Sequence, residues 1–303
     1  MKQRTKEIFN LVRDVWIAAR PLSLTLALYS TTLGMVIAHS EDKLFTHDLK
    51  LDIWKVFLVT VAGLFVQTGT NLINDYFECE YKYRRQRGKR YTFLGRQRTK
   101  FDILIFLLGI VFFLLTALLG LYLVYLTTPL LLYIGAIGII GGYSYTGEPI
   151  AYKKRGLGAL LSFILMGPLM VYGAYLVFAQ DLSWAPVVLG MPLSLMIPLL
   201  MMSNELRDYE RDKSLNIRTL TVRLGYRFGK GLYLGLLIGS YGLTALYVIL
   251  GMLPMASLLV FVTLPLARAS YRMVSVARRE GVPITNKLHL SFGLILILSM
   301  IIW

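Results

Sequence analysis

The sequence NLINDYFECEYKYRRQRGKR, residues 71–90, follows a long and almost uncharged stretch of the chain. Its first half carries amide and carboxylate side chains at Asn71, Asn74, Asp75 and Glu78. Its second half is strongly basic. Ionisable groups at the end of an apolar helix are costly to place in a bilayer, and in membrane proteins they usually have a function. The stretch therefore predicts a membrane helix that ends in a polar site.

The composition of the whole chain agrees with a membrane protein. Of its 303 residues, 56% are hydrophobic and 16% are charged, whereas soluble domains have about 45–50% apolar and about 25% charged residues. The single cysteine, Cys79, excludes an internal disulfide framework and is too little for a zinc site. We predict an all-α, polytopic membrane protein in which one transmembrane domain occupies residues 1–303.

The number of membrane helices follows from the lengths of the apolar stretches. Crossing the hydrocarbon core takes about 20 apolar residues per helix. On this criterion we predict a bundle of nine transmembrane helices, at residues 15–38, 53–75, 102–126, 128–145, 156–179, 183–205, 230–250, 253–274 and 287–303.

The distribution of basic residues predicts the orientation of this bundle. If the N-terminus is cytoplasmic, all of the 32 Lys and Arg except Lys43, Lys50 and Lys55 lie at the cytoplasmic side, as the positive-inside rule requires. We therefore expect a cytoplasmic N-terminus and an outside C-terminus, in an inner or plasma membrane. The net charge of +15 also favours contact with anionic lipid or an anionic substrate. Because the charge is divided among several loops, we expect no nucleic-acid partner.

A second acidic stretch, SNELRDYERDKSLNIRTL, repeats the pattern of the first. It places Asn204, Asp208 and Asp212 four residues apart, as Asn71 and Asp75 are in the first stretch. Steps of three and four residues keep side chains on one face of a helix. A single Asp at a helix end is usually only solvated, but two matching stripes favour a shared site.

The residue types in these stripes predict the metal. Carboxylate and amide oxygens without His or Cys ligands favour a hard cation, and Mg²⁺ binds through one or two carboxylates together with substrate phosphates. We predict metal ligands at Asp75, Glu78, Asn204, Asp208 and Asp212, and among them Asp75, Asp208 and Asp212 as catalytic residues.

Carboxylates alone would repel a diphosphate, so the nearby basic residues matter as much. Arg and Lys side chains can bind the phosphate oxygens that a metal leaves free. For most single cations the orientation rule is a sufficient explanation. Arg207, inside the second stripe, and Arg20, at the mouth of the first span, are the exceptions. We predict diphosphate-binding residues at Arg20, Asn71, Asn74, Lys153, Arg207, Lys213 and Arg218.

These motifs resemble those of the UbiA superfamily of intramembrane prenyltransferases, and most of all those of the polyprenyltransferases that act on dihydroxynaphthoate in menaquinone biosynthesis. The resemblance covers nearly the whole chain. Glu78 departs from the family pattern, which usually has Asp at this position. The motifs that carry the resemblance are ARPLSL, NLINDYF, YTGEPIAYKKRGLG, GPLMVYGAY, NELRDYERDKSLNIRTLTVRLG and KLHLSFGLILIL.

The resemblance implies that the nine helices surround a central cavity. Both acidic motifs would face this cavity and hold Mg²⁺ and a prenyl diphosphate. The reaction would begin with ionisation of the allylic C–O bond, and an aromatic acceptor would then attack the allylic cation. Aromatic faces can stabilise such a cation. The candidates are Tyr143, Tyr145, Phe163 and Tyr172, and for each of them packing in the core is the alternative.

Two other functions stay open on the sequence alone. The acceptor could instead be hydroxybenzoate, homogentisate, a prenylglyceryl phosphate or haem. A secondary transporter of an anionic solute is more remote, because ionisable residues at the membrane midplane are almost absent. We expect His39 and His289 to be structural histidines with satisfied hydrogen bonds.

Overall fold

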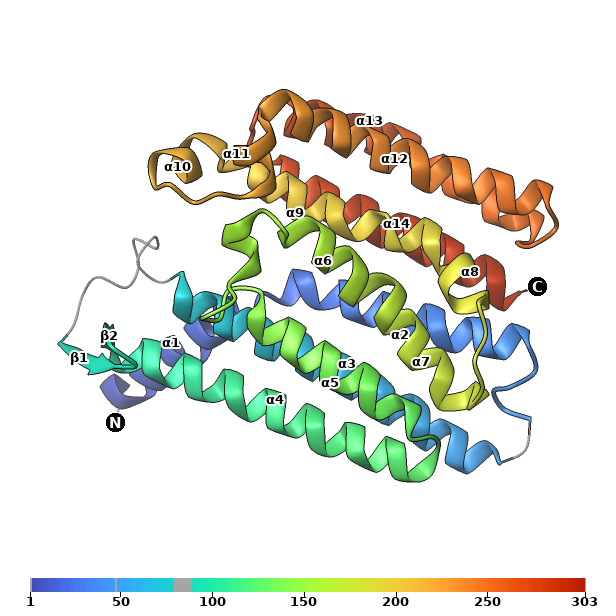
Figure 1. The fold of residues 1–303 in the computed structure, drawn as a ribbon, viewed down its shortest axis with the longest axis horizontal. Coiled ribbons are helices and arrows are strands. Elements are labelled where there is room, and N and C mark those ends of the chain that lie inside the picture. Colours follow the sequence, from blue (N-terminus) through green and yellow to red (C-terminus); the bar gives the residue numbers. More distant parts are fainter. Residues whose placement is uncertain (1, 47, 79–88, 303) are drawn as a thin grey trace.

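The computed structural model describes residues 2–46, 48–78 and 89–302, with side chains from residue 8 onward. Long helices lie side by side along the long axis of the molecule (Figure 1). The helices of the first half are α1 (Lys2–Ala19), α2 (Pro21–Ser40), α3 (Leu49–Phe77), α4 (Lys100–Leu126), α5 (Leu130–Ser144), the 3-10 turn η3 (Tyr152–Arg155), α6 (Gly158–Ile164), η4 (Leu165–Leu169) and α7 (Met170–Ala179). Those of the second half are α8 (Ala185–Ser194), α9 (Met196–Arg207), α10 (Tyr209–Ser214), α11 (Leu220–Leu224), α12 (Tyr226–Ile249), η5 (Met255–Thr263), α13 (Leu264–Val274) and α14 (Gly281–Ile301).

The all-α membrane architecture predicted from the sequence is confirmed. Within the described residues, seven helical segments are long and apolar enough to cross a membrane: Pro21–Ser40, Lys100–Leu126, Gly158–Ala179, Ala185–Arg207, Tyr226–Ile249, Met255–Val274 and Gly281–Ile301. Two further helices, α3 and the shorter α5, coincide with the predicted spans 53–75 and 128–145. The count of nine spans stays a prediction.

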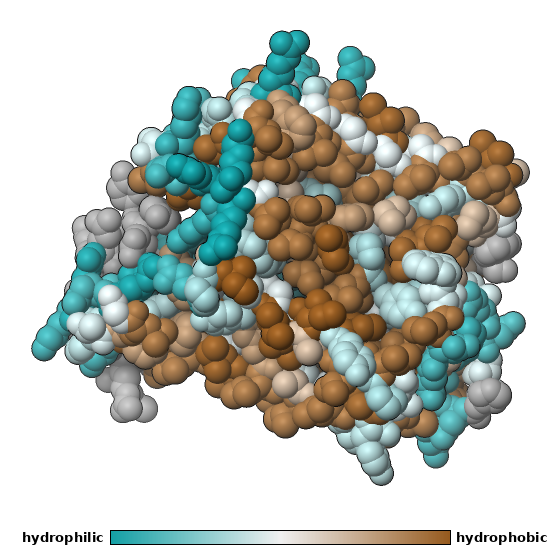
Figure 2. Space-filling model, viewed as in Figure 1, coloured by the Kyte–Doolittle hydropathy of each residue, from teal (hydrophilic) through white to brown (hydrophobic). Residues whose placement is uncertain are grey.

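The surface agrees with this class of protein. Figure 2 shows hydrophobic residues over the middle of the visible face and hydrophilic residues gathered toward its two ends. Large apolar side chains such as Leu118, Tyr125, Ile140 and Leu259 are exposed. Exposed apolar residues in such numbers favour contact with lipid, because a water-soluble monomer rarely exposes large contiguous apolar patches.

The first predicted span, 15–38, is wrong at its N-terminal end. The helix breaks at Arg20, whose φ of 52° is left-handed, so that α1 ends at Ala19 and α2 begins at Pro21. A proline disfavours the helical conformation in the residue before it and is well suited to the first helical position. The helix α1 is separate and amphipathic, with Phe9 and Trp16 exposed, which suits a position at the membrane surface.

Close packing between α2 and α7 depends on a small residue. A Cβ on Gly34 would lie 2.2 Å from the carbonyl oxygen of Val171 and 2.8 Å from the Cβ of Ala174. Helices in membranes associate through such small residues because their backbones can then approach closely. Gly34 therefore fixes how α7 lies against α2.

The predicted span 156–179 is a helix with an irregular turn in its middle. Gly167 has φ −86° and ψ −107°, and Pro168 follows it in the π-turn η4. Proline has no N–H to donate and breaks the regular helical ladder, and π-turns inside helices are frequent at functional sites. The segment around this turn supplies Leu165, Met166 and Met170 to the wall of the cavity described below.

The two acidic motifs lie at the same end of the bundle. Figure 1 shows the end of α3, the hairpin β1 (Arg90–Phe93) and β2 (Arg96–Thr99), and the short helices α10 and α11 all at this end, with the C-terminus at the other. The strands pair antiparallel, with Arg90 opposite Thr99. The basic run that the sequence places at residues 82–90 lies almost entirely outside the described residues. That this end is cytoplasmic stays a prediction.

Candidate active site

A cavity of about 440 Å³ opens at the end of the bundle where the two motifs lie. Helices α2, α3, α5, α9, α10 and α14 contribute to its wall, together with η3, α6 and η4. Four cations and four carboxylates line it: Arg20, Lys153, Arg207 and Arg211, and Glu78, Glu205, Asp208 and Asp212. Segments far apart in the sequence thus place alternating charges around one space.

Glu78 is the carboxylate of the first motif that faces this cavity. Lys153 forms an ion pair with it, and the Arg20 guanidinium lies 3.7 Å from its Oε2. Burial raises the pKa of the Glu78 carboxyl, but the charges of Lys153 and Arg20 lower it by more, so the pKa lies below its ordinary value. Burial likewise lowers the pKa of Lys153, while Glu78 raises it to a net value above the ordinary one. The pair is therefore ionised at neutral pH.

The second motif pairs its carboxylates with its own arginines. Arg207 donates to both oxygens of Asp208, at 2.9 and 2.6 Å. Arg211 reaches Asp208 at 3.0 Å and Asp212 at 2.8 Å. Burial raises the pKa of Asp208, but the hydrogen bond from Arg207 and the nearby charges bring it below its ordinary value. The pKa of Asp212 is raised, because burial outweighs the effect of Arg211 there.

The sequence analysis missed Arg211 as a cavity residue, and two cations that it predicted to bind diphosphate lie outside the cavity lining. Among the described residues that line the cavity, neither Lys213 nor Arg218 appears, and both are exposed. Lys213 lies over the ring of Tyr209, 6.0 Å from its centroid. The helix α10 ends at Ser214, and Asn216 turns the chain with φ 54°, which carries Arg218 away. Only the three-residue step from Asp208 to Arg211 could have indicated Arg211.

The two asparagines of the first motif, Asn71 and Asn74, have different hydrogen-bond partners and different positions relative to the cavity. Asn71 lines the cavity and donates to the Ala19 carbonyl at 2.7 Å and to Ser23 Oγ at 2.8 Å, which ties α3 to the break between α1 and α2. Asn74 is 1% exposed and accepts a hydrogen bond from Arg20, so it orients that guanidinium from behind. Asp75 is 2% exposed and is not among the residues that line the cavity within the described part of the chain.

Glu205 is a further cavity residue that the sequence analysis did not single out. Its side chain is buried and accepts hydrogen bonds from the backbone N–H of Thr221 at 3.0 Å and from its hydroxyl at 3.1 Å. These bonds attach α11 to α9. The three-residue step from Glu205 to Asp208 could have indicated that Glu205 shares the face of the helix with Asp208.

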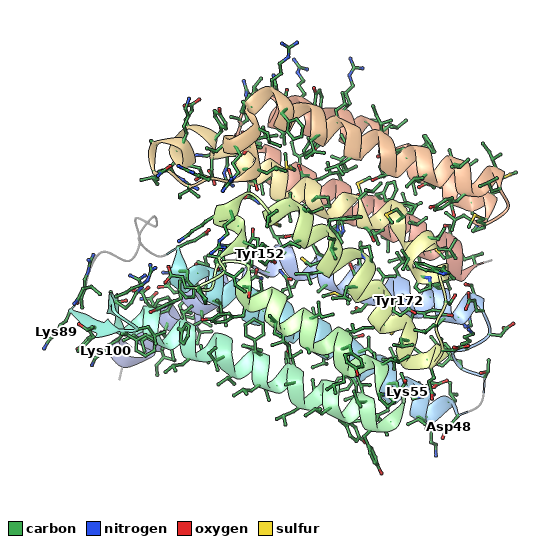
Figure 3. All side chains as sticks on the ribbon, in the orientation of Figure 1. Asp48, Lys55, Lys89, Lys100, Tyr152 and Tyr172 are labelled. Carbon is green, nitrogen blue, oxygen red and sulfur yellow. The ribbon has the colours of Figure 1, made fainter. Side chains whose placement is uncertain are left out.

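Of the four aromatic candidates, Tyr145 alone is among the described residues that line the cavity. Lys153 Nζ lies 5.6 Å from its ring centroid. Tyr143 packs edge-on against Phe77, 6.5 Å between centroids, in the aromatic core. Tyr172 is labelled in Figure 3 at the opposite end of the bundle from Tyr152. Tyr143 and Tyr172, which packs against Tyr175, thus have the packing role that was the alternative for each.

The donor set at the cavity fits Mg²⁺ in its chemistry. Glu78 and Asn71 from α3 and Asn204, Asp208 and Asp212 from the second motif offer only oxygen ligands. No group of three or more His, Cys, Asp or Glu in the described residues is close enough to hold a metal alone. This agrees with an ion held by one or two carboxylates and completed by phosphate oxygens.

A second, apolar cavity of about 330 Å³ adjoins the first. The two share the lining residues Val66, Gly138, Leu165 and Met170. The rest of its wall is mostly aliphatic and comes from α2, α3, α4, α5 and the η4–α7 segment. The charged site thus lies directly beside an apolar cavity.

Comparison with known proteins identifies this arrangement. The profile of the UbiA prenyltransferase family matches residues 27–291. The UbiA prenyltransferase domain-containing protein 1 of Rattus norvegicus is 30% identical over 94% of this chain and 82% of its own. The 1,4-dihydroxy-2-naphthoate octaprenyltransferase of Bacillus subtilis is 25% identical over 70% of this chain and 66% of its own.

Solved structures have the same fold. A UbiA homolog from Aeropyrum pernix superposes with a TM-score of 0.63 at 15% identity, over 90% of this chain and 98% of its own. A homolog from Archaeoglobus fulgidus, solved bound to DMAPP and Mg²⁺, gives 0.57 at 15% identity, over 92% and 97%. From the family match across most of its length, this chain belongs to the UbiA prenyltransferase family and is a multi-pass membrane prenyltransferase.

Proposed function

We propose that this enzyme transfers a polyprenyl group from a prenyl diphosphate to dihydroxynaphthoate, in a Mg²⁺-dependent step of menaquinone biosynthesis, at the cytoplasmic side of an inner or plasma membrane. The observation that carries the proposal is that a charged cavity and an apolar cavity lie side by side and share four lining residues. A prenyl diphosphate likewise has a charged part, the diphosphate, and an apolar part, the hydrocarbon tail.

The cations around the charged cavity suit the diphosphate. Arg20, Lys153, Arg207 and Arg211 come from four different elements and point at one space. Each forms an ion pair or a hydrogen bond with a carboxylate or an amide of the site, and this contact fixes its position. Donors fixed in advance stabilise the charge that develops on the departing diphosphate without reorganising during the reaction.

The carboxylates Glu78, Asp208 and Asp212 would hold Mg²⁺ together with phosphate oxygens. Bound there, the ion would supply positive charge to the leaving group. Asp75 is proposed as a ligand as well, although it lies deeper than the cavity wall. The structure of the Archaeoglobus fulgidus homolog with DMAPP and Mg²⁺ supports this assignment.

Residues around the allylic carbon would protect the cation that forms. The Tyr145 ring faces the cavity, and aromatic faces attract cations. The apolar wall that begins at Val66 and Leu165 excludes water from the tail side, which keeps water from competing with the acceptor. The acceptor ring then attacks the allylic carbon and loses a proton.

The names of two related proteins support dihydroxynaphthoate as the acceptor. The relatives from Bacillus subtilis and Mycobacterium leprae are 1,4-dihydroxy-2-naphthoate octaprenyltransferases, at 25% and 28% identity. The alternative is the same reaction on hydroxybenzoate, homogentisate, a prenylglyceryl phosphate or haem.

The experiment is an acceptor panel run on the purified protein in lipid nanodiscs. Isotope-labelled prenyl diphosphates of several lengths are offered with each acceptor, with Mg²⁺ or with EDTA, and products are identified by mass. We expect prenylated naphthoate in the presence of Mg²⁺ only. Preferential prenylation of hydroxybenzoate, or no product from any acceptor, would reject the proposal.

A further inference from the structure

The helix α14 forms a wall of the charged cavity without bringing any charge to it. Val282, Pro283 and Asn286 from this helix line the cavity. His289 follows one turn later on the same face, about 4.5 Å further along the axis at 1.5 Å per residue. It does not line the cavity but lies behind Asn286 in the interior of the bundle.

Both side chains are buried, and among the described residues each has polar atoms without a hydrogen-bond partner. Asn286 is 3% exposed and His289 is 1% exposed. Within the described part of the chain, neither the Asn286 Oδ1 nor either ring nitrogen of His289 has a partner. The expectation that His289 would be a satisfied structural histidine is therefore wrong. Buried polar groups are nearly always paired, and a group that is not calls for an explanation such as a bound ligand.

Other buried polar groups of the same helix are paired. Thr285, next to Asn286, forms hydrogen bonds of 2.8 Å with both Tyr233 and Ser270. Ser299, further along, is 2.8 Å from Ser257. The bundle thus satisfies the polar groups that only hold its helices together. The lack of partners at residues 286 and 289 is confined to the part of α14 beside the cavity.

Two aromatic rings of the protein are stacked behind Asn286. The His289 imidazole stacks on the ring of Tyr29 from α2, with centroids 5.6 Å apart and planes at 24°. Gly293 makes room for Tyr29, because a Cβ there would lie 2.4 Å from its Cδ2. Asn286 thus stands between the charged cavity and a stacked pair of rings.

An amide side chain can hydrogen-bond some parts of the two substrates better than others. The parts to consider are the diphosphate, the prenyl tail and the ring of the aromatic acceptor. Cations at the break before α2 and on η3, α9 and α10 are available for the diphosphate. The prenyl tail cannot form hydrogen bonds. A phenolic hydroxyl both donates and accepts, and a neutral amide does the same. We propose that Asn286 hydrogen-bonds a ring hydroxyl of the aromatic acceptor and so orients the ring against the allylic carbon. This inference rests on the proposed function.

The test compares the parent acceptor with analogues that lack one hydroxyl hydrogen. Wild type and Asn286→Leu are assayed with dihydroxynaphthoate and with each of its two mono-O-methyl ethers, at saturating prenyl diphosphate. For wild type we expect the kcat/KM of one of the two ethers to be about tenfold lower than that of dihydroxynaphthoate, because this ether cannot form one buried hydrogen bond. For Asn286→Leu, the kcat/KM values of this ether and of dihydroxynaphthoate should agree within a factor of two. Its KM for prenyl diphosphate should stay at the wild-type value.

Controls separate this role from a merely structural one. Asn286→Ala guards against a steric effect of leucine and should give the same loss of discrimination. Ser299→Ala removes a paired polar group from the same helix away from the cavity and should keep the wild-type preference. Equilibrium binding of dihydroxynaphthoate without prenyl diphosphate gives a readout independent of turnover and should weaken about tenfold in both Asn286 variants.

Two outcomes overturn the inference while leaving the proposed function in place. One is an Asn286→Leu enzyme that keeps the wild-type preference between parent and ether. The other is a rise in its KM for prenyl diphosphate with no change for the acceptor. If wild type prenylates no aromatic acceptor at all, the proposed function itself fails.

Discussion

Lys153 donates to the carboxylate of Glu78, and so joins the turn η3 after α5 to the C-terminal end of α3. The pair faces the cavity that the second acidic motif also lines. It links a residue of the first motif to a cation of the YTGEPIAYKKRGLG segment.

The carboxylates of the second motif should be essential for turnover. Asp208→Asn and Asp212→Asn should each lower kcat by about 10²–10³-fold, since losing a group that stabilises the transition state electrostatically has effects of this size. Both proteins should insert and stay folded, as shown by size-exclusion profile and melting temperature. Asp48→Asn, at the opposite end of the bundle, is the matched control and should keep full activity. Near-normal turnover of either variant across a Mg²⁺ titration would argue against metal binding there.

Glu78 should tolerate a shorter carboxylate but not its removal. Glu78→Ala leaves Lys153 and Arg20 without their shared partner and removes a metal ligand, so it should lose most activity. Glu78→Asp keeps the charge and should retain much of it. Steady-state kinetics of the two variants side by side provide the measurement. A silent Glu78→Ala would reduce Glu78 to a structural ion-pair residue.

The ion pair of Glu78 should also appear in the pH dependence of stability. Its folded pKa is below the ordinary value of 4.5, so the stabilisation is fully present above about pH 4.5 and is lost as the pH falls through the lower, folded pKa. The difference in melting temperature between wild type and Glu78→Gln should be constant from pH 8 to pH 5 and shrink below that. A difference that already closes at pH 6 would contradict the lowered pKa.

The bundle should present both motifs to the same side of the membrane. In a Cys79→Ser background, Thr92→Cys in the hairpin and Ser214→Cys at the end of α10 should react with an impermeant thiol reagent from the cytoplasmic face. Asp181→Cys, between α7 and α8, should react from the outer face. Labelling of residues 92 and 214 from opposite faces would rule out a shared site.

The apolar cavity should determine which tails are accepted. A Cβ on Gly138 would meet nothing within 4 Å, and this residue lines both cavities. Gly138→Leu should therefore project into the channel and lower kcat/KM for C20 and longer diphosphates about tenfold, since overfilling a packed space costs about 1–3 kcal/mol. Gly242→Leu, on the exposed face of α12, is the control. Equal effects on short and long substrates would place the tail elsewhere.

Much of the fold followed from the sequence because hydrophobic length and charge are strong constraints in a bilayer. The break at Arg20 was missed because the length criterion ignores backbone geometry, although Pro21 could have indicated it. The site was predicted where spacing fixes a helical face, as at Asn204, Asp208 and Asp212. It was not predicted where the chain leaves the helix, as after Ser214.

Contacts between helices could not be predicted from one motif at a time. The burial of Asp75, the bond from Glu205 to Thr221 and the unpartnered Asn286 each depend on which helix lies opposite. The periodicity of a sequence shows which residues share one face of a helix, but it does not show which other helix packs against that face. This is why the sequence indicated the diphosphate end of the site and gave no residue for the acceptor.

The most direct test of the central claim is a double-mutant cycle between the two motifs. The kcat/KM for prenyl transfer is measured for wild type, Glu78→Ala, Asp208→Asn and the double variant, with labelled prenyl diphosphate. Residues that act as one catalytic unit have strongly non-additive effects. If both motifs hold one diphosphate in one cavity, the double variant should be little worse than the worse single variant. Losses that multiply would contradict a single shared site.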